Sequence, residues 1–448
     1  MKQLKALLVN PYIYDFSAFN YWSTPLGLLY LGSILRKNNI KIKLIDCLRV
    51  DENKRKEDGR APFLKNIVDK PLSLKNIKKR FKRYGISKNV LIEELSLLEK
   101  PDIVLVTSIM TYWYMGAKEV IEATRTVFSD TKIILGGIYP SLCYEHALKE
   151  MTEADLIVKN NEMNKFYNFV EKILSSTLLS KLNQYDFDSL PYPCFDLYDN
   201  IPFIPIITSY GCIYKCTYCA TPYMHPEMVR RKPEDTSKEI LFWHNRNVKK
   251  FVIYDDNFLF KKDQFAKPLL RLIADYPFKI SIYNPNALNA ALIDEELAFL
   301  LMEAGFKEVR IGFETANSQI QKSTGGKVNH IIFEKALKFL TKAGFSPKTI
   351  SVYILAGLPF QNWIDVKKTI DYVSNAGATV HIAEYTPIPH TSMFDKYKSF
   401  ARFPISDYPE YQNNALFPFA WECFTENDLS FLKQYARKMN GNIDKIFQ

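Results

Sequence analysis

Short apolar runs alternate with longer amphipathic stretches along the first 175 residues of the chain. The runs have the length of strands, and the stretches between them carry apolar residues at helical spacing. Strands that alternate with helices predict a doubly wound parallel α/β sheet. Five runs are expected to form its strands: KALLVN, IKIKLIDC, DIVLVTSI, KIILGG and DLIVKN. We predict that residues 1–175 form this first domain.

The carboxyl ends of these strands indicate where a ligand would bind, because doubly wound sheets bind ligands beyond that edge. The residues expected there are Asn10, Pro11, Thr107, Ser108, Gly136 and Gly137. Three consecutive aromatic residues, Tyr112, Trp113 and Tyr114, follow the third strand. They suit either stacking on a flat ring, such as a corrin or a base, or packing against the next domain.

A second series of strands and helices follows a linker. Residues 176–205 form the linker, and their four prolines suit an extended crossing between domains. Residues 206–388 hold six strand-like runs, and three of the helices between them end in Ala-Gly, a helix stop. This pattern predicts a partial (β/α)6 barrel. Residues 389–448 are expected to form a tail with one helix, which closes the barrel mouth in one interpretation.

Polar side chains fall at the carboxyl ends of the predicted barrel strands, where such barrels place their active sites. They are Cys212 to Cys219 after the first strand, Asp255 to Asn257 after the second, Asn284 and Asn286 after the third, Glu314 at the fourth and Pro359 after the fifth. The coincidence predicts an active site. The alternative is that these residues are strand-end caps, ion pairs within the barrel and turn residues.

The length and composition restrict the class of protein. A chain of 448 residues with 47% hydrophobic positions can form two or three packed domains. No apolar stretch approaches the roughly 20 residues of a membrane span, and the N-terminus lacks a signal-peptide cleavage site. We therefore expect a soluble, cytoplasmic protein without a membrane span.

The net charge of +10 is concentrated in one segment. Residues 49–88 hold fourteen Lys and Arg against five Asp and Glu, and Phe81 and Tyr84 lie among the cations. Cations interleaved with aromatic residues are typical of a nucleic-acid footprint. The alternative is a solvated surface insertion, so a nucleic-acid partner through 49–88 remains one of two interpretations.

Three of the seven cysteines form a C-x3-C-x2-C run, Cys212, Cys216 and Cys219. An odd number of cysteines with three in one run argues for metal binding rather than disulfides. The other four are expected to be small buried residues: Cys47, Cys143, Cys194 and Cys423. A zinc site would need a fourth ligand, for which His225 is the nearest candidate. A [4Fe–4S] cluster held by three thiolates would leave one iron free for a small molecule.

This run, placed after the first strand of a βα barrel, resembles the radical SAM (S-adenosylmethionine) family. The resemblance implies an enzyme whose [4Fe–4S] cluster cleaves SAM reductively. A 5′-deoxyadenosyl radical then abstracts hydrogen from a substrate, with the electron delivered by an external flavodoxin- or ferredoxin-type donor. The cofactor supplies this chemistry, and the protein positions it. No residue is singled out as catalytic, and the substrate is not readable from the sequence.

The resemblance extends residue by residue over roughly 200–400. It implies that Cys212, Cys216 and Cys219 ligate the cluster and that the other matching positions contact SAM. Those positions are Tyr218, Asp255, Asp256, Asn257, Arg310, Glu314, and the Gly357, Leu358, Pro359 segment.

Residues 5–170 resemble the cobalamin (B12)-binding-type domain that precedes many radical SAM cores. The resemblance makes Thr107, Ser108, Gly136 and Gly137 candidates for contacting cobalamin. The segment at Asp46 lacks the D-x-H-x-x-G motif, so no histidine is offered there as a lower axial cobalt ligand. Two interpretations stay open: bound cobalamin, or a flavodoxin-like domain kept for packing or substrate binding.

The sequence thus favours a radical SAM enzyme. Two subclasses stay open: cobalamin-dependent methyl transfer and a cobalamin-independent radical modification. A tRNA methylthiotransferase is disfavoured, because relatives of that kind carry three N-terminal cluster cysteines. Here only Cys47 and Cys143 precede residue 190. A non-catalytic iron–sulfur or nucleic-acid-binding protein is disfavoured by the cofactor-type residues at several strand ends.

Overall fold

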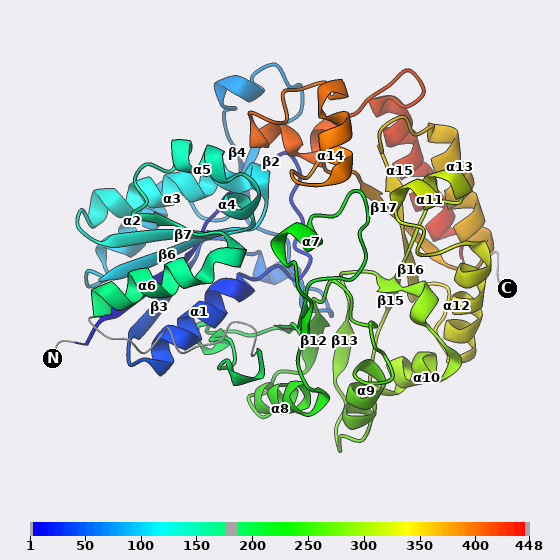
Figure 1. Ribbon diagram of the computed structural model, residues 1–448, viewed down its shortest axis with the longest axis horizontal. Coiled ribbons are helices and arrows are strands. Elements are labelled where there is room, and N and C mark those ends of the chain that lie inside the picture. Colours follow the sequence, from blue (N-terminus) through cyan, green and yellow to red (C-terminus); the bar gives the residue numbers. More distant parts are fainter. Residues whose placement is uncertain (1–2, 175–186, 444–448) are drawn as a thin grey trace. The chain divides into compact units, whose positions relative to one another are not determined.

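A computed structural model describes residues 3–174 and 187–443 in two compact units (Figure 1). Unit 1 comprises Met1–Pro202 with Ser406–Ala415, and unit 2 comprises Phe203–Ile405 with Leu416–Gln448. Residues 176–186 of the predicted linker lie outside the described residues. The domain boundaries drawn from the sequence stay a prediction.

Unit 1 is built on a five-stranded parallel sheet of order β3-β1-β6-β7-β8. Its strands are β1 (Lys5–Asn10), β3 (Lys41–Asp46), β6 (Ile103–Ser108), β7 (Lys132–Gly137) and β8 (Leu156–Ile157). The order in space is that of a flavodoxin-like fold, with the crossing point between β1 and β6. The predicted doubly wound sheet is confirmed. The register pairs Thr107 with Gly136 and Ser108 with Gly137 at the carboxyl edge.

Helices cover both faces of this sheet, because its central strands are buried on both sides. Figure 1 shows α1 and α6 on one face and α2 and α3 on the other. Leu91 and Leu95 from α2 and Val120 and Ile121 from α3 pack into one apolar core with the strands. The helices of unit 1 are α1 (Leu26–Lys37), α2 (Lys88–Ser96), α3 (Tyr114–Val127), α4 (Ile138–Leu142), α5 (Tyr144–Glu150) and α6 (Met163–Leu174).

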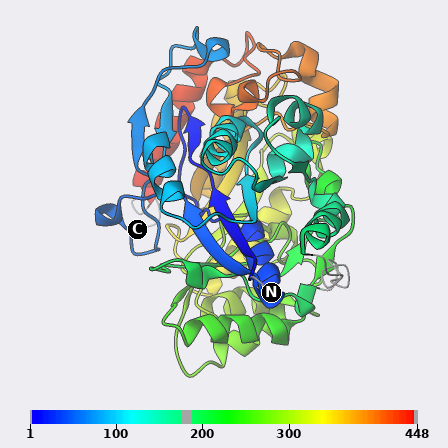
Figure 2. The same ribbon diagram turned by 90° about the vertical axis from the view of Figure 1, so that its left-hand side faces the viewer.

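The basic insertion 49–88 folds onto unit 1 as part of a small antiparallel sheet. Strands β4 (Lys65–Ile67) and β5 (Lys82–Tyr84) pair with β2 (Ile13–Asp15) in the order β2-β5-β4, which can be followed in Figure 2. Phe81 and Tyr84 are buried there, and Phe81 stacks on Tyr14. Both rings therefore anchor the insertion and are not exposed for stacking on a base. A nucleic-acid role for 49–88 stays a prediction.

Residues 406–415 of the predicted tail belong to unit 1 and bring three buried polar side chains into it. The Glu410 carboxylate accepts hydrogen bonds from the Ser73 hydroxyl at 2.6 Å and the Tyr114 hydroxyl at 3.1 Å. The Asn413 side-chain amide donates to Asp15 at 2.9 Å. Buried polar groups paired in this way fix the segment in one place.

Unit 2 is a series of βα units with two parallel sheets. Strands β9 (Ile204–Ile206), β12 (Lys250–Ile253) and β13 (Ser281–Tyr283) form the order β13-β12-β9. Strands β14 (Leu288–Asn289), β15 (Val309–Glu314), β16 (Ile350–Ala356) and β17 (Thr379–Glu384) form the order β14-β15-β16-β17. All six predicted strands are present, and the α/β class is confirmed. Over residues 187–443 the two sheets do not join into a closed barrel.

The helices of unit 2 end where the sequence predicts. In α10, α12 and α13 the Ala-Gly pairs place Gly305, Gly344 and Gly377 just past the last turn with φ of +98°, +104° and +88°. Glycine takes this left-handed conformation without a Cβ penalty. The helices are α7 (Thr221–Met224), α8 (Pro233–His244), α9 (Ala266–Ala274), α10 (Glu295–Glu303), α11 (Ser318–Thr324), α12 (His330–Lys342), α13 (Trp363–Asn375), α14 (Ser392–Tyr397) and α15 (Glu426–Gly441).

Within the described residues, no helix combines the length and apolarity that a membrane crossing needs. The scattered cysteines are free, as predicted. Cys47 and Cys194 are buried, Cys143 is half-buried and Cys423 is exposed, so the expectation that all four are buried holds for Cys47 and Cys194 and is wrong for Cys423. Its place between α14 and α15, next to the bridge between Trp421 and Phe424, leaves its side chain in solvent.

Candidate active site

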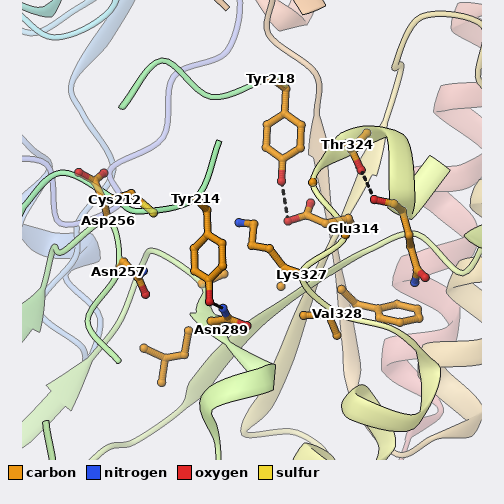
Figure 3. A pocket seen from close by; sticks show the side chains of 17 residues that line it. Cys212, Tyr214, Tyr218, Asp256, Asn257, Asn289, Glu314, Thr324, Lys327 and Val328 are labelled. Atoms are coloured by element: carbon orange, nitrogen blue, oxygen red, sulfur yellow. Dashed lines mark hydrogen bonds between the residues drawn. The ribbon is translucent and has the colours of Figure 1, made fainter. Parts of the chain in front are cut away.

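One pocket of unit 2 lies at the carboxyl ends of its strands (Figure 3). It holds about 580 Å³, part of which is open to solvent. Cys212 forms part of its wall, Asp256 and Asn257 follow β12, and Glu314 ends β15. Further lining residues come from 287–289 and from 321–328, the end of α11 and the loop after it.

Cys212, Cys216 and Cys219 lie on one loop, called the cysteine loop. The buried carboxylate of Asp255 anchors the backbone just before this loop. Asp255 accepts hydrogen bonds from the Thr208 N–H at 2.6 Å, from the Thr208 hydroxyl, and from the Ser209 hydroxyl at 2.7 Å. Gly211, with φ +85°, then turns the chain into the loop, because a Cβ there would lie 2.7 Å from the Glu227 carbonyl oxygen. Burial raises the pKa of Asp255 against the opposing effect of Arg230 and these donors.

The middle of the loop is fixed through the backbone of Thr217. Its N–H donates to the Thr324 carbonyl oxygen at 3.2 Å, and its carbonyl oxygen accepts from the Met393 N–H at 2.9 Å. Gly325 lies directly against Cys216, since a Cβ on Gly325 would come within 3.2 Å of the Cys216 Sγ. The glycine therefore lets the loop after α11 pack closely on the cysteine loop.

Glu314 presents its carboxylate to the pocket from a bulge at the end of β15. The residue has φ +68°, a conformation that non-glycine residues keep mainly at functional sites. Its Oε1 accepts a hydrogen bond from the Tyr218 hydroxyl at 2.8 Å. Burial raises the pKa of Glu314, although Lys327 and Tyr218 act in the opposite direction.

Lys327 extends its ammonium group into the space between Tyr214 and Glu314 (Figure 3). Its Nζ lies 5.4 Å from the centroid of the Tyr214 ring. Burial alone would lower the pKa of Lys327, but its interactions with Cys216 and Glu314 outweigh burial and raise the pKa. The side chain is therefore held as a cation beside the cysteine loop.

The three thiols of the cysteine loop are free. Burial raises the pKa of Cys212 and of Cys216, so coordination to iron would release their protons. In the described ranges, no three His, Cys, Asp or Glu side chains converge as the ligands of one ion do. In a [4Fe–4S] cluster each thiolate binds a different iron, so its ligands stand farther apart.

The sequence profile of the radical SAM superfamily matches residues 206–373. These residues are a radical SAM domain. The match contains the cysteine loop, β12 to β16 and the loop after α11, and therefore the residues that line the pocket. The pocket is therefore part of a radical SAM domain.

Similarity to known proteins extends beyond the radical SAM domain. An uncharacterized methyltransferase of Pyrococcus horikoshii is 22% identical over 460 residues, covering 96% of this chain and 88% of that protein. The bacteriochlorophyllide d C-8(2)-methyltransferase of Chlorobaculum tepidum is 23% identical over 308 residues, 63% of this chain and 66% of that protein.

A solved structure resembles the whole fold. The radical SAM methyltransferase TsrM from Kitasatospora setae, with cobalamin and a [4Fe–4S] cluster bound, matches with a TM-score of 0.64 at 17% identity. The match covers 89% of this chain and 78% of TsrM. At this identity the likeness shows the fold.

The structure brings about half of the predicted residues of the radical SAM domain into the pocket. Cys212, Tyr218, Asp256, Asn257 and Glu314 line it. Cys216 lies directly behind the wall, against Gly325, whereas Cys219 contacts the hydroxyl of Thr221, which does not line the pocket.

Other predicted residues of the radical SAM domain make internal contacts and do not line this pocket. Asp255 holds the start of the cysteine loop. Arg310 donates to Glu308 at 2.8 Å and to the Tyr353 hydroxyl at 2.9 Å. The N–H groups of Gly357 and Leu358, next to Pro359, donate to the Gln361 side chain. Cofactor contacts by these residues stay predictions. Asn284 and Asn286 bond to backbone carbonyl groups, as turn residues do.

Sequence reasoning missed a part of the radical SAM pocket. Tyr214, Asn289 and Lys327 line it, and the Asn289 amide donates to the Tyr214 hydroxyl at 2.9 Å. The signal was present in the segment STGGKV, residues 323–328, where two glycines precede a lysine just after α11. Paired glycines mark close backbone approach, and here they lie on the cysteine loop.

One buried polar atom at the pocket has no partner in the described residues. It is Nδ2 of Asn257, whose residue is 6% exposed. An unpaired buried donor costs about 1–3 kcal/mol unless a ligand accepts from it. Nδ2 of Asn257 is therefore suited to donate to a carboxylate or hydroxyl oxygen of SAM.

Asp256→Asn is expected to stabilise the metal-free protein, and more so at high pH. Burial and the neighbouring Asp255 raise the pKa of Asp256 to about 6. The folded state then binds more protons than the unfolded state, so its stability falls as pH rises from about 4 to about 6. At pH 8 the variant should gain about 2–3 kcal/mol, since each tenfold change in proton affinity corresponds to about 1.4 kcal/mol.

Urea denaturation at pH 8 and pH 5 measures this effect, and the gain should be smaller at pH 5. Asp275→Asn, at an exposed side chain, serves as the control and should change stability equally little at both values. A gain from Asp256→Asn that does not depend on pH would show that Asp256 is not a high-pKa group.

In unit 1, Thr107 and Gly136 are partly exposed at the carboxyl edge, while Ser108 is buried. Gly136 borders open space, because a Cβ on it would meet no atom within 4 Å. Gly137 has φ +104°, and a Cβ there would lie 2.6 Å from the Ser108 carbonyl oxygen. Two adjacent glycines thus leave the backbone of this edge uncovered by side chains.

The aromatic residues 112–114 are engaged within unit 1. Tyr114 stacks on Tyr139 at 5.4 Å, and the Trp113 indole N–H donates to Asp15 at 2.6 Å. Tyr112 is buried. Tyr114 therefore packs within unit 1, and both interpretations of this run, stacking on a ligand ring and packing against the next domain, stay predictions.

Proposed function

We propose that this radical SAM enzyme transfers a methyl group to a substrate carbon with the help of cobalamin. The observation that carries the radical SAM part is the wall of the pocket, where the cysteine loop faces Asn257, Glu314 and Lys327. The methyl-transfer part is supported by relatives named as methyltransferases and by the likeness of both units to TsrM.

The residues of this chain would hold two of the cofactors in unit 2. Cys212, Cys216 and Cys219 would ligate a [4Fe–4S] cluster, and the unpaired amide of Asn257 would contact SAM. When bound, the cluster supplies the electron that cleaves SAM, taken from an external flavodoxin- or ferredoxin-type donor. The pocket walls orient SAM and limit the access of water.

The exposed backbone at the carboxyl edge of the unit 1 sheet is suited to contact cobalamin. Gly136 and Gly137 expose backbone there, beside Thr107, and the flavodoxin-like strand order places ligands at this edge. The residues described in unit 1 include one histidine, His146, whose Nδ1 lies 2.7 Å from the Tyr139 hydroxyl. Cobalamin would be held at this edge through backbone and hydroxyl groups.

Gly136→Val is expected to abolish retention of cobalamin and to leave the cluster content unchanged. The Val side chain would project into the space that Gly136 leaves open, and β-branched residues suit a strand. The apoprotein is mixed with hydroxocobalamin, desalted and read by visible spectroscopy. Gly27→Val, at an exposed glycine of α1 that also borders open space, is the matched control and should retain cobalamin. Retention by Gly136→Val would refute this location.

The alternative is a cobalamin-independent radical modification. It is favoured by Asp46, which opens the segment that lacks the D-x-H-x-x-G motif. The Asp46 carboxylate accepts hydrogen bonds from Asn10 at 2.8 Å and from Tyr198 at 2.6 Å, both within unit 1. A wild-type protein that stays colourless after desalting would decide for it.

The radical SAM activity is tested on the wild-type chain alone. The protein is reconstituted anaerobically with iron and sulfide, reduced and mixed with SAM, and 5′-deoxyadenosine is measured. Formation of 5′-deoxyadenosine is expected. A verified cluster without this product would overturn the proposal.

A further inference from the structure

We propose that Lys327 sets the reduction potential of the cluster by placing a fixed positive charge beside the cysteine loop. The inference rests on the proposed cluster at Cys212, Cys216 and Cys219. It concerns a residue outside the cysteine motif, and it assigns to Lys327 an electrostatic role that does not require SAM to be bound.

The first observation is the placement of the segment that carries Lys327. The Thr217 N–H, inside the cysteine loop, donates to the Thr324 carbonyl oxygen at 3.2 Å. Gly325 follows, and a Cβ on it would lie 3.2 Å from the Cys216 Sγ. The Gly326 N–H donates back to the Gln321 carbonyl oxygen at 2.8 Å, which closes the turn. Lys327 therefore begins from a backbone that is tied to the cluster ligands.

The second observation is the charge of the pocket wall. Among the described residues that line it, Lys327 is the one cation, and Asp256 and Glu314 are the carboxylates. Figure 3 shows the Lys327 side chain directed into the pocket, between Tyr214 and Glu314. A charge in a partly buried site acts over several ångströms with little screening by salt.

The third point is the charge that the cluster would bring. Three thiolates outweigh the positive charge of an oxidised [4Fe–4S] core, so the site is anionic and becomes more so by one charge on reduction. The reduction potential of such clusters depends on net charge and on hydrogen bonds to the sulfurs. A neighbouring ammonium group stabilises the reduced state more than the oxidised state, and it therefore raises the potential.

The test is a comparison of midpoint potentials in the full-length, reconstituted protein without SAM. The variants are Lys327→Met, which removes the charge, and Lys327→Arg, which keeps it. Lys322→Met is the matched control, because Lys322 is exposed on α11 and does not line the pocket. Iron and sulfide contents are measured first, and the reduced cluster is then followed by electron paramagnetic resonance in a dithionite titration with mediators.

Lys327→Met is expected to lower the equilibrium constant for one-electron reduction about tenfold or more, which corresponds to about 59 mV toward more negative potential. Lys327→Arg and Lys322→Met should stay close to the wild type. An unchanged potential in Lys327→Met at equal cluster content would overturn the proposal. A shift that appears only after SAM is added would also overturn it and would assign Lys327 to binding the cofactor.

The same variants and the wild type also decide what a failure to assemble the cluster would mean. If Lys327→Met fails to assemble a cluster, retention of the cluster at wild-type potential in Lys327→Arg supports a role of the charge. Loss of the cluster in both variants would show a structural role and overturn the proposal. A wild type that assembles no cluster would refute the proposed function itself, whereas a wild-type cluster with an unshifted variant would refute only the role of Lys327.

Discussion

In a Cys216→Ala variant, 5′-deoxyadenosine formation is expected to fall to the background of metal-free protein, together with the iron content. Two thiolates would remain where the cluster needs three, and the chain offers no other cysteine on the loop. The fold should persist, because removing one small buried sulfur costs only about 1 kcal/mol. Iron and sulfide analysis, product formation and the melting temperature are measured on the same preparation.

Cys423→Ala is the matched control for this variant. Cys423 is exposed and lies outside the cysteine loop, so its replacement should leave iron content, product formation and melting temperature unchanged. Full iron content in Cys216→Ala would show that the cluster has another set of ligands. Loss of iron in both variants would indicate a general effect of cysteine removal on reconstitution.

The parts of the fold that the sequence predicts are those governed by local rules. The Ala-Gly pairs before Gly305, Gly344 and Gly377 end their helices as expected, because glycine alone takes the left-handed conformation without strain. The strands β12, β15 and β16 appear where apolar runs of strand length lie. Local chemistry also places Cys212, Asp256 and Glu314 at strand ends, and the parallel arrangement then brings them to one pocket.

The parts of the fold that the sequence does not predict depend on contacts between distant parts of the chain. Nothing near Glu410 or Asn413 in sequence indicates that they would fold with residues Ser73 and Asp15. Phe81 and Tyr84 lie in a charged segment, and their burial follows from pairing of β5 with β2. Tertiary burial of this kind overrides composition, which is why the segment could be taken for an open basic surface.

At single residues of unit 2, too, the local sequence does not determine which side chains face the pocket. Lys327 was missed because its distance from Cys216 in sequence exceeds one hundred positions, and only the fold joins them. The resemblance implies a cofactor contact for Asp255, which stays a prediction, and the carboxylate accepts hydrogen bonds from Thr208 and Ser209. Adjacent residues at a strand end point in different directions, so the pattern YDDN could not tell which carboxylate would face the pocket.

Asp255→Ala is expected to destabilise unit 2 by about 3 kcal/mol or more and to reduce cluster retention. The substitution removes the acceptor of three hydrogen bonds at the start of the cysteine loop, and it leaves the Thr208 N–H and two hydroxyl groups buried without partners. Each unpaired buried group costs about 1–3 kcal/mol, and loss of one partner in a buried charged network costs about 3–5 kcal/mol.

Asp255→Asn separates the hydrogen bonds from the charge. Its side-chain oxygen can still accept from the Thr208 N–H, and its amide can donate to the two hydroxyl oxygens once they rotate. Because burial raises the pKa of Asp255, the neutral amide is a close substitute, and we expect less than half of the loss seen in Asp255→Ala. Asp275→Ala, at an exposed side chain, should change stability by less than about 0.5 kcal/mol.

Stability is measured on metal-free protein by urea denaturation, and amide hydrogen exchange over residues 207–220 reports the local effect. Faster exchange in this segment, with unit 1 unchanged, is the expected pattern in Asp255→Ala, because the carboxylate anchors only the entry to the loop. If stability were unchanged while cluster retention fell, Asp255 would instead contact the cofactor, as its position in the sequence suggested. The stability of the metal-free protein, compared with cluster retention after reconstitution, thus distinguishes the two roles of this carboxylate.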